Sequence, residues 1–253
     1  MSLLIDADFI VYKCCAACED EIDFGDDVIL VTSRFSEIYE MVERELYSIA
    51  TCLGEFDDSI LFFSDSKNFR KTIDPNYKGQ RNRKKPCGYR RVINKLKENY
   101  PVIIFPNLEA DDALGIWATK EPHQHIIVSP DKDMRQIPGL LFNLKDGVEE
   151  ITPEEGLEWH YIQTLAGDQT DGYSGVPGLG VKRSKILFDK EGLTWKTIVT
   201  AFASKGLDEK VAMQNALLAK ILQTENYDIE TSTINFWTPP PTPSAGVDTG
   251  ARV

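Results

Sequence analysis

Short apolar runs alternate with longer amphipathic segments over about the first 150 residues of the chain. The short runs are rich in Ile, Val, Leu and Phe, which is typical of strands buried on both faces of a sheet. The longer segments carry apolar residues at the three- and four-residue spacing of one helix face. The runs predict strands at residues 3–5, 28–32, 60–63, 102–105, 126–129 and 140–144, and the segments predict helices at 35–53, 90–99 and 110–120. This alternation favours an α/β fold with a doubly wound, mostly parallel sheet.

The pattern becomes helical in the second half of the chain. Thr152 and Glu155 form a capping box around Pro153, which predicts a helix that begins there and ends near residue 166. A glycine-rich stretch follows, and helical spacing then returns at residues 181–189, 194–204 and 208–225.

Three parts are therefore expected along the chain. Residues 1–151 form an α/β domain, residues 152–237 form a helical module, and residues 238–253 form a disordered tail. The tail is assigned by its composition, since it consists mainly of Pro, Thr, Ser, Gly and Ala and carries almost no large apolar residue.

Charge is distributed very unevenly along the sequence. The chain has 253 residues, of which 42% are hydrophobic, so it can bury a large core. Its 28 Lys and Arg against 40 Asp and Glu give a net charge of −12, which by itself argues against a nucleic-acid partner. Residues 67–97, however, hold twelve cations and one acid, Asp74, so this basic segment carries +11 and the remainder carries about −23.

The sequence also restricts the compartment and the chemistry. It has no run of 18 apolar residues, and its N-terminus lacks the charged start and the long apolar stretch of a signal peptide. The odd count of five cysteines argues against a disulfide framework. We therefore expect a cytoplasmic protein with reduced thiols and no membrane partner. No histidine lies near a Ser or Cys nucleophile in the sequence, so a catalytic triad has no support.

Acidic residues follow the predicted strands, where the carboxyl ends of a parallel sheet form a site. Like charges in such a cluster repel each other unless cations are present, and carboxylate oxygens with few histidines suit Mg²⁺ or Mn²⁺. Two such ions form the clamp used in phosphodiester hydrolysis. Acids at strand ends also serve as helix caps and turn formers, and Asp8 is open to that reading. The acids that can converge are Asp6, Asp65, Glu109, Asp111, Asp112, Asp131, Asp133, Asp168 and Asp171.

Within the basic segment, residues 76–85 place an aromatic side chain, Tyr77, among cations. Aromatic rings stack on bases and cations contact phosphates, so the combination favours a channel for a nucleic-acid strand. The alternatives are a solvated basic loop and a nuclear-localisation-like run.

A glycine hairpin joins two predicted helices of the second half. Gly175, Gly178 and Gly180 allow tight turns, and the helix that follows presents amides to an anion, with Lys182 and Arg183 adding charge. This pattern predicts a helix–hairpin–helix that holds a DNA phosphate without reading bases.

The order of these motifs is informative. The Asp after the first strand is followed by Phe63-Ser64-Asp65-Ser66, Tyr77-Lys78, Glu109-Ala110-Asp111-Asp112, Asp131-Lys132-Asp133, Gly167-Asp168-Gln169-Thr170-Asp171-Gly172 and the glycine hairpin. This order resembles the flap-endonuclease and 5′-nuclease superfamily. Further stretches are similar to the 5′→3′ exonucleases of podophages of the T-seven type, and the resemblance covers about residues 1–237. These stretches are Asp74-Pro75-Asn76-Tyr77-Lys78, Lys85-Pro86-Cys87-Gly88-Tyr89, Ser129-Pro130-Asp131-Lys132-Asp133 and Thr170-Asp171-Gly172-Tyr173-Ser174-Gly175.

The resemblance implies a PIN-like nuclease domain with a helix–three-turn–helix module. It implies that all nine acids named above are direct or water-mediated metal ligands, with Asp168 and Asp171 as the second-metal pair. Lys78, which would steer the scissile phosphate, Asp111 and Asp131 are the expected catalytic residues. The hairpin is similar to a duplex-binding element that often holds a K⁺ ion. The expected DNA contacts are Arg70, Tyr77, Lys78, Arg81, Arg83, Lys84, Lys85, Gly175, Gly178, Gly180, Lys182 and Arg183.

The activity implied by the resemblance is 5′→3′ DNA exonuclease activity with flap endonuclease activity, carried out with two Mg²⁺ or Mn²⁺ ions in phage replication or recombination. RNase H activity remains open. The implied partner is DNA with a 5′ end, as a duplex, nick or flap, or an RNA–DNA hybrid, and the expected protein is a monomer in the host bacterial cytoplasm. The alternatives are a PIN-type ribonuclease and a non-catalytic DNA-junction binder.

Overall fold

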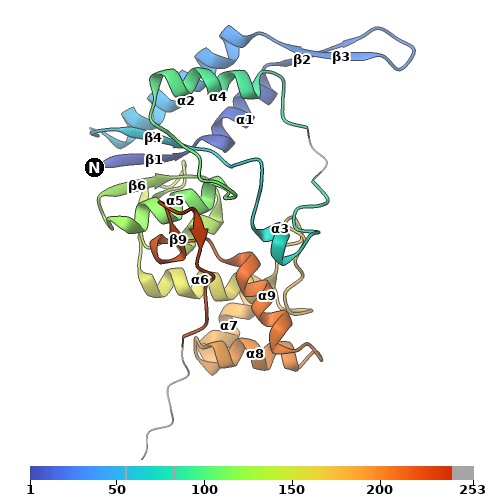
Figure 1. Ribbon diagram of the computed structural model, residues 1–253, viewed down its shortest axis with the longest axis vertical. Helices are drawn as coiled ribbons and strands as arrows, with labels where there is room; N and C mark the ends of the chain where they lie inside the picture. The colour runs from blue at the N-terminus through green and yellow to red at the C-terminus, as the bar shows by residue number, and fades with distance from the viewer. Residues whose placement is uncertain (55, 82–83, 241–253) are drawn as a thin grey trace, which may run out of the picture.

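The computed structural model describes residues 1–54, 56–81 and 84–240. Its centre is a six-stranded sheet in the order β5-β4-β1-β6-β7-β8, parallel except for β8, which runs antiparallel to β7 (Figure 1). The predicted mixed α/β fold with a mostly parallel sheet is confirmed. The six strands are β1 (Ser2–Asp6), β4 (Ser59–Phe62), β5 (Val102–Ile103), β6 (His125–Val128), β7 (Gly139–Phe142) and β8 (Val148–Ile151).

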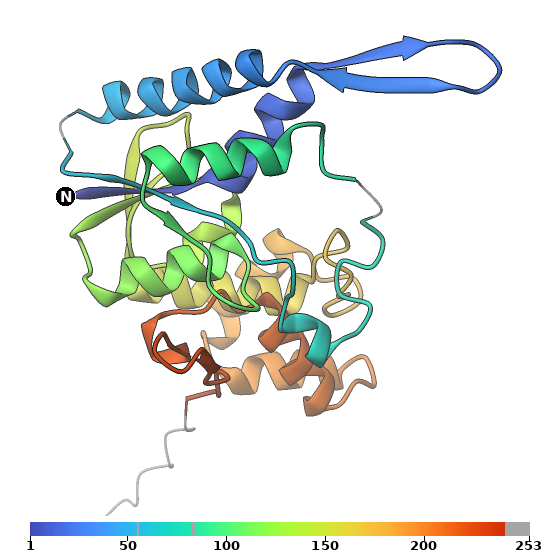
Figure 2. The same ribbon diagram turned by 45° about the horizontal axis from the view of Figure 1, so that its top comes forward.

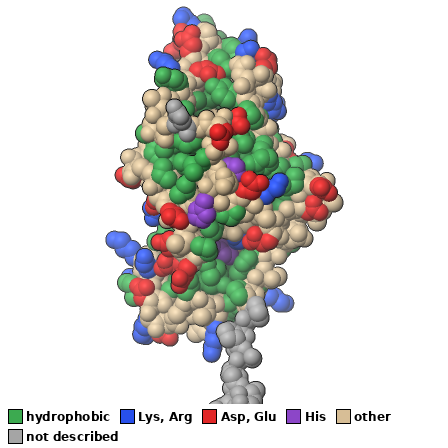
Figure 3. Space-filling view, turned by 90° about the vertical axis from the view of Figure 1, so that its left-hand side faces the viewer, with side chains coloured by type: hydrophobic (Ala, Val, Ile, Leu, Met, Phe, Trp, Pro, Cys, Tyr) green, Lys and Arg blue, Asp and Glu red, His purple; other side chains and the backbone are tan. Residues whose placement is uncertain are grey.

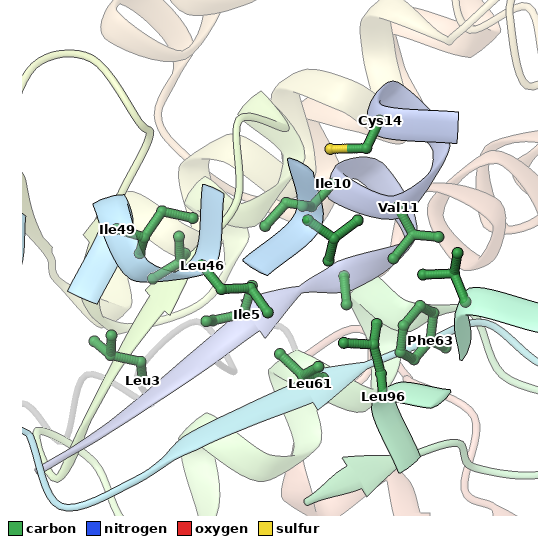
Figure 4. Packing of buried hydrophobic residues seen from close by; sticks show 14 of the residues in the cluster. Leu3, Ile5, Ile10, Val11, Cys14, Leu46, Ile49, Leu61, Phe63 and Leu96 are labelled. Atoms are coloured by element: carbon green, nitrogen blue, oxygen red, sulfur yellow. The ribbon is translucent and has the colours of Figure 1, made fainter. Parts of the chain in front are cut away.

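Helices cover both faces of this sheet, as Figures 1 and 2 show. On one face, α1 (Ala7–Ala17), α2 (Phe35–Leu53) and α4 (Tyr89–Asn99) pack against strand residues such as Leu3, Ile5 and Leu61, seen in Figure 4. On the other face, α5 (Ala110–Lys120) and the short helix η1 (Lys132–Gln136) pack against Leu4 and Phe62. Because side chains alternate along a strand, neighbours such as Leu3 and Leu4 enter opposite cores.

The second half contributes a helical layer below the sheet. Its helices are α6 (Pro153–Ala166), α7 (Val181–Glu191), α8 (Trp195–Ala203) and α9 (Glu209–Ala219). They enclose a core of their own that includes Tyr161, Phe188 and Phe202. The helix predicted over 208–225 extends six residues too far at its C-terminal end, because α9 ends at Ala219 and the chain continues in an extended conformation from Lys220. The short helix η2 (Thr224–Asn226) and the ribbon of β9 (Tyr227–Asp228) and β10 (Thr233–Ile234) complete this half. The division into domains at residue 151 stays a prediction, and residues 241–253 of the predicted tail lie outside the described residues.

One predicted sheet strand is wrong. Residues 28–32 were expected to form a buried strand, but β3 (Ile29–Ser33) pairs only with β2 (Glu19–Asp23) in a hairpin that projects from the body (Figure 2). Its apolar side chains are exposed, including Val28 at 56% and Ile29 at 58%. The apolar run alone could not distinguish a core strand from a projecting ribbon, since both have the same local preference.

The basic segment includes α3 (Arg70–Ile73), which lies on the right-hand side of Figure 1, and most of α4; Figure 3 shows the opposite, left-hand side of that view. On the face in Figure 3, acidic and basic side chains are interspersed among apolar ones. In the described part of the chain, every helix is too short or too polar to cross a bilayer.

Candidate active site

A cleft of about 300 Å³ lies between the sheet's carboxyl edge, the basic segment and the helical layer. It brings together residues that are far apart in the sequence, because β1 and β6 are adjacent and parallel and therefore end at one edge. Its acidic lining consists of Glu109, Asp111, Asp131, Asp133, Asp168 and Asp171, and its basic lining consists of Arg70, Lys78, Arg81 and Lys132.

Four carboxylates of the site lie at helix starts that follow strands. Asp6, the last residue of β1, caps α1 by accepting from the Phe9 amide at 3.4 Å. Asp131, which follows β6, caps η1 by accepting from the Asp133 amide at 2.9 Å. Glu109 is the N-cap of α5, so Asp111 lies in that helix's first turn. Acids are favoured at these positions because free helix amides point at them.

Three carboxylates at the centre, those of Asp6, Asp111 and Asp131, repel one another. Burial raises the pKa of Asp6 to about 6, and the charges of Asp8 and Asp131 add to this against a 2.9 Å hydrogen bond from Ser129. Burial, and then the charges of Asp6 and Asp131, raise the pKa of Asp111 well above its usual range. These groups would be stabilised as anions by an added cation.

Asp133 shows the same deficit of positive charge. Burial, and then the charge of Asp131, raise the pKa of Asp133 to about 7. Its Oδ1 is buried and has no hydrogen-bond partner among the residues that the structure describes. A buried carboxylate oxygen without a partner is costly, and an all-oxygen donor set suits a hard divalent ion. The residues present therefore fit Mg²⁺ or Mn²⁺.

The protein's own cations neutralise the other side of the cleft. Lys78 Nζ lies 2.5 Å from Glu109 Oε1 and 3.7 Å from Asp171 Oδ2, and Arg81 lies 2.5 Å from Asp171 Oδ1. Although burial opposes it, Lys78 and then Arg70 hold the pKa of Glu109 below its usual value. Lys78 has φ of +53° and donates its amide to the Asp171 carbonyl at 2.8 Å, which fixes the two motifs side by side.

Within residues 1–54, 56–81 and 84–240, no three Asp, Glu, His or Cys side chains are arranged so that they could hold a metal ion as they stand. In this arrangement Lys78 and Arg81 are paired with Glu109 and Asp171, and Asp111 is repelled by the charges of Asp6 and Asp131.

Comparison with known proteins agrees with this geometry. Residues 1–158 match the profile of the family described as "5′-3′ exonuclease, N-terminal resolvase-like domain". The chain belongs to this 5′-3′ exonuclease family.

Full-length relatives are found among phage nucleases. The chain is 29% identical to the exodeoxyribonuclease of Enterobacteria phage T3, over 94% of this chain and 92% of that protein. It is 27% identical to the exonuclease of Escherichia phage T7, over 94% of this chain and 93% of that protein. A solved structure with a similar fold is that of a bacteriophage T5 flap endonuclease, a pseudo-enzyme–product complex with DNA and metal ions. It superimposes on this chain with a TM-score of 0.61 at 14% identity, and the match covers 87% of this chain and 89% of that one. The last likeness shows the fold.

Three of the expected metal ligands of this exonuclease lie outside the lining of the cleft, namely Asp6, Asp65 and Asp112. Asp112 is fully buried, and Arg70 donates to its two oxygens at 2.7 and 2.8 Å. Asp65 accepts from the amides of Ser66 at 2.6 Å and Asn107 at 2.8 Å, and the Asn107 hydrogen bond lowers the pKa of Asp65. The side chains of Asp112 and Asp65 are therefore both held by hydrogen bonds with the protein, whereas the resemblance implied that they are metal ligands.

Two expected DNA contacts are also buried. Arg70 is 3% exposed and Tyr77 is 3% exposed, so neither side chain is open to stack on a base or to reach a phosphate. The Tyr77 hydroxyl lies 3.1 Å from Glu109 Oε2 and 3.0 Å from Asp171 Oδ2. It has one proton and donates to one carboxylate at a time, so Tyr77 ties the two acidic motifs together.

The remaining basic residues lie on the surface. Lys84, Lys182 and Arg183 are exposed, and Lys85 lies over the Tyr89 ring, with Nζ 4.2 Å from the ring centroid. Arg83 lies outside the described residues.

The glycine hairpin has two kinds of glycine. A Cβ at Gly175 would lie 2.4 Å from the Gly167 amide nitrogen and from the Leu165 carbonyl oxygen, so its role is close packing of the protein backbone. Gly178, with φ of +85°, and Gly180, which begins α7, have no atom within 4 Å of such a Cβ and face open space. Asp168 holds the preceding turn by accepting from the Thr170 amide at 2.7 Å.

Sequence reasoning did not identify two supporting residues. Ser129 is fully buried and joins Asp6 to Asp131, because its Oγ donates to Asp6 and accepts from the Asp131 amide at 3.2 Å. Asp8, whose role was left open, accepts from the Ser64 amide at 2.9 Å and from the Tyr89 hydroxyl. The place of Ser129 at a strand end, two residues before an acid, was the available signal.

Proposed function

We propose that this chain is a 5′→3′ DNA exonuclease with flap endonuclease activity, which hydrolyses phosphodiesters with two divalent metal ions. One observation carries the proposal: buried carboxylates that lack cations, led by Asp111, line the same cleft as Lys78 and Arg81. Excess negative charge suits metal ions, while the adjacent cations suit a phosphate. The likeness to the phage T3 and T7 exonucleases supports the same activity.

The acidic residues of the site would bind metal ions, and its basic residues would bind the phosphate. Asp6, Asp111, Asp131 and Asp133 would hold one ion, and Asp168 and Asp171 would share the second. When bound, the two ions would supply Lewis acidity and would offset the charge that develops on the phosphate oxygens. Lys78 and Arg81, now paired with Glu109 and Asp171, would turn to the scissile phosphate.

DNA would be held from two sides. The exposed amides at the start of α7, together with Lys182 and Arg183, would contact phosphates of the duplex. Lys84 and Lys85 of the basic segment would contact the strand that carries the 5′ end. We include DNA with a nick or flap and RNA–DNA hybrids as substrates, a monomer as the active form, and the host bacterial cytoplasm as its location.

A K⁺ ion at the hairpin is part of the same proposal. Backbone carbonyls of residues 175–180 would hold it against a DNA phosphate. Duplex binding measured in K⁺ and in Na⁺ at equal ionic strength tests this, and equal affinities would contradict it.

The test of the main proposal is cleavage of a 5′-labelled duplex in Mg²⁺ by the wild type, by Asp131→Ala and by Asp58→Asn. Asp58 is exposed and directly precedes β4, at the amino end of the sheet and not at the carboxyl edge that borders the cleft, so its variant is the control. We expect Asp131→Ala to lose cleavage while it keeps its melting temperature to within a few degrees, and Asp58→Asn to cleave normally. Full activity in Asp131→Ala would contradict the assignment.

A panel of substrates separates the alternatives. A PIN-type ribonuclease would cleave single-stranded RNA faster than 5′-ended DNA. A non-catalytic junction binder would bind nicked DNA and release no product in Mg²⁺ or Mn²⁺. Either result would replace the proposed function.

A further inference from the structure

Arg70 occupies an unusual position for a residue of a DNA-facing basic segment. It is the first residue of α3 and is 3% exposed. Its Nη1 and Nη2 donate to both oxygens of Asp112, its Nε donates to the Leu218 carbonyl at 2.9 Å, and its Nη2 also donates to the Lys220 carbonyl at 2.6 Å. The guanidinium also lies over the Phe69 ring, at 4.7 Å from the ring centroid.

These contacts join three parts of the chain that are distant in sequence. Arg70 belongs to the basic segment, Asp112 to the first turn of α5, and residues 218–220 to the end of α9. Asp112 also accepts from the Leu222 amide at 3.1 Å, so the extended segment after α9 is attached to the same carboxylate. One guanidinium therefore fixes the relative position of the basic segment, the acidic helix start and the helical layer.

The joined segments carry the proposed reaction. Asp111 precedes Asp112 in α5, and Glu109 lies 3.4 Å from Arg70 Nη1. Lys78 follows α3 by five residues, and its place beside Glu109 depends on where α3 is anchored. A shift of α3 relative to α5 would change the distance between the phosphate-directing cation and the carboxylates.

DNA contact is a poor explanation for Arg70. Its donors are already used by Asp112, Leu218 and Lys220, and a phosphate would have to displace a bidentate buried ion pair. Arg81, which is 48% exposed in its side chain, offers a phosphate a guanidinium at far lower cost.

We propose that Arg70 is a positioning residue for phosphodiester hydrolysis: it sets the place of Lys78 relative to Glu109 and Asp111 through Asp112 and the end of α9, and it makes no contact with DNA. This inference rests on the proposed nuclease function. Misplacement of reacting groups by about 1 Å costs about 100-fold in rate, so the loss of Arg70 should appear in turnover.

The experiment compares the wild type, Arg70→Lys, Arg70→Gln, Arg81→Gln and Arg34→Gln. Arg34 is an exposed arginine paired with Glu37 on α2 and is the matched control. Single-turnover cleavage is measured in Mg²⁺, well below the melting temperature of each variant. The affinity for nicked duplex is measured in EDTA across a series of salt concentrations.

We expect single-turnover rates to fall about 100-fold in Arg70→Gln and about 10-fold in Arg70→Lys, which keeps the charge but not the bidentate geometry. The slope of log affinity against log salt should stay at the wild-type value in both, whereas Arg81→Gln should make it shallower by about 0.9. A shallower slope in the Arg70 variants would show a phosphate contact and would overturn the proposal. An unchanged rate in either folded variant would overturn it as well.

The pair variant Arg70→Met with Asp112→Leu separates positioning from stability. Replacing both partners of a buried ion pair by apolar residues is commonly neutral for stability, whereas Arg70→Gln leaves Asp112 uncompensated. We expect the pair variant to melt at a higher temperature than Arg70→Gln and to keep the slow cleavage, although the Leu218 and Lys220 carbonyls and the Leu222 amide lose their partners. Recovery of full cleavage would show that the pair only stabilises the fold. If the wild type itself cleaves nothing, the proposed function fails, while the salt slopes still decide whether Arg70 contacts DNA.

Discussion

Replacement of His160 should make the stability of this protein less sensitive to acid. His160 is buried among the helices of the second half, with Nε2 2.9 Å from the Ala216 carbonyl and Trp237 packed edge-on at 4.9 Å. Burial, and then the charge of Lys220, lowers the pKa of His160 to about 3. An imidazole in water protonates near 6.5, so between pH 6.5 and 3 the unfolded chain binds a proton that the folded chain does not.

The direction in which stability changes with pH follows from this difference in bound protons. Because the unfolded state binds more protons in that window, the free energy of unfolding falls as the pH is lowered from 6.5. Each pH unit costs about 1.4 kcal/mol, so His160 alone removes about 2 kcal/mol at pH 5. His160→Gln keeps a donor for Ala216 and does not titrate. At pH 8 it should be about 1 kcal/mol less stable than the wild type, since the aromatic contact with Trp237 is lost.

The assay is urea unfolding followed by far-UV circular dichroism, for wild type and His160→Gln at pH 8, 6.5 and 5. The variant should be the less stable protein at pH 8 and the more stable one at pH 5. All other titrating groups are common to both proteins, so the difference isolates His160. A difference in unfolding free energy that stays constant from pH 8 to pH 5 would refute the reasoning.

Three further predictions concern the cleft and the hairpin. Asp111→Asn should raise the melting temperature in EDTA by about 2–4 °C, since about 1 kcal/mol of repulsion with Asp6 and Asp131 is removed. The same variant should lose the further rise in melting temperature that Mg²⁺ gives the wild type. A lower melting temperature than the wild type in EDTA would contradict this. If about five phosphates are neutralised, log affinity for duplex DNA plotted against log salt concentration should have a slope near −4.5. Lys182→Ala and Arg183→Ala should each reduce the magnitude of this slope by about 0.9. An affinity that does not change with salt would exclude the hairpin and the basic segment as DNA contacts. Gly175→Ala, at φ of +60° and with its Cβ 2.4 Å from backbone atoms, should lower the free energy of unfolding by at least about 2 kcal/mol. Gly178→Ala, at φ of +85° in open space, should lower it by about 1 kcal/mol. Equal melting temperatures of the two variants would be inconsistent with the packing described.

The sequence was sufficient for elements whose signal is local. The helices predicted at residues 35–53 and 110–120 have those bounds in the structure. Their apolar spacing and capping residues act within a few positions along the chain. The carboxylates after β1 and β6 could likewise be assigned to one edge, because parallel strands end together.

Predictions failed where distant residues decide the outcome. Residues 28–32 have a strand's composition, but pairing with β2 keeps them out of the sheet. The helix predicted to reach residue 225 ends at Ala219. Arg70, which lies about 150 positions earlier, donates to the Leu218 and Lys220 carbonyls at this helix end. The spacing of apolar residues along the chain does not show that residues 28–32 pair with β2 or that Arg70 contacts the end of α9.

The sequence by itself determined the α/β order of elements, the concentration of cations between residues 67 and 97, and the set of acids that could meet at a metal site. The tertiary structure decided how those charges are used. Spacing alone treats Asp111 and Asp112 as equivalent, but Asp111 lines the cleft and Asp112 is neutralised by Arg70. Likewise Tyr77 is buried between two carboxylates. Charge and polarity are properties of each residue, whereas burial and the choice of partner depend on which distant segments the fold places around it.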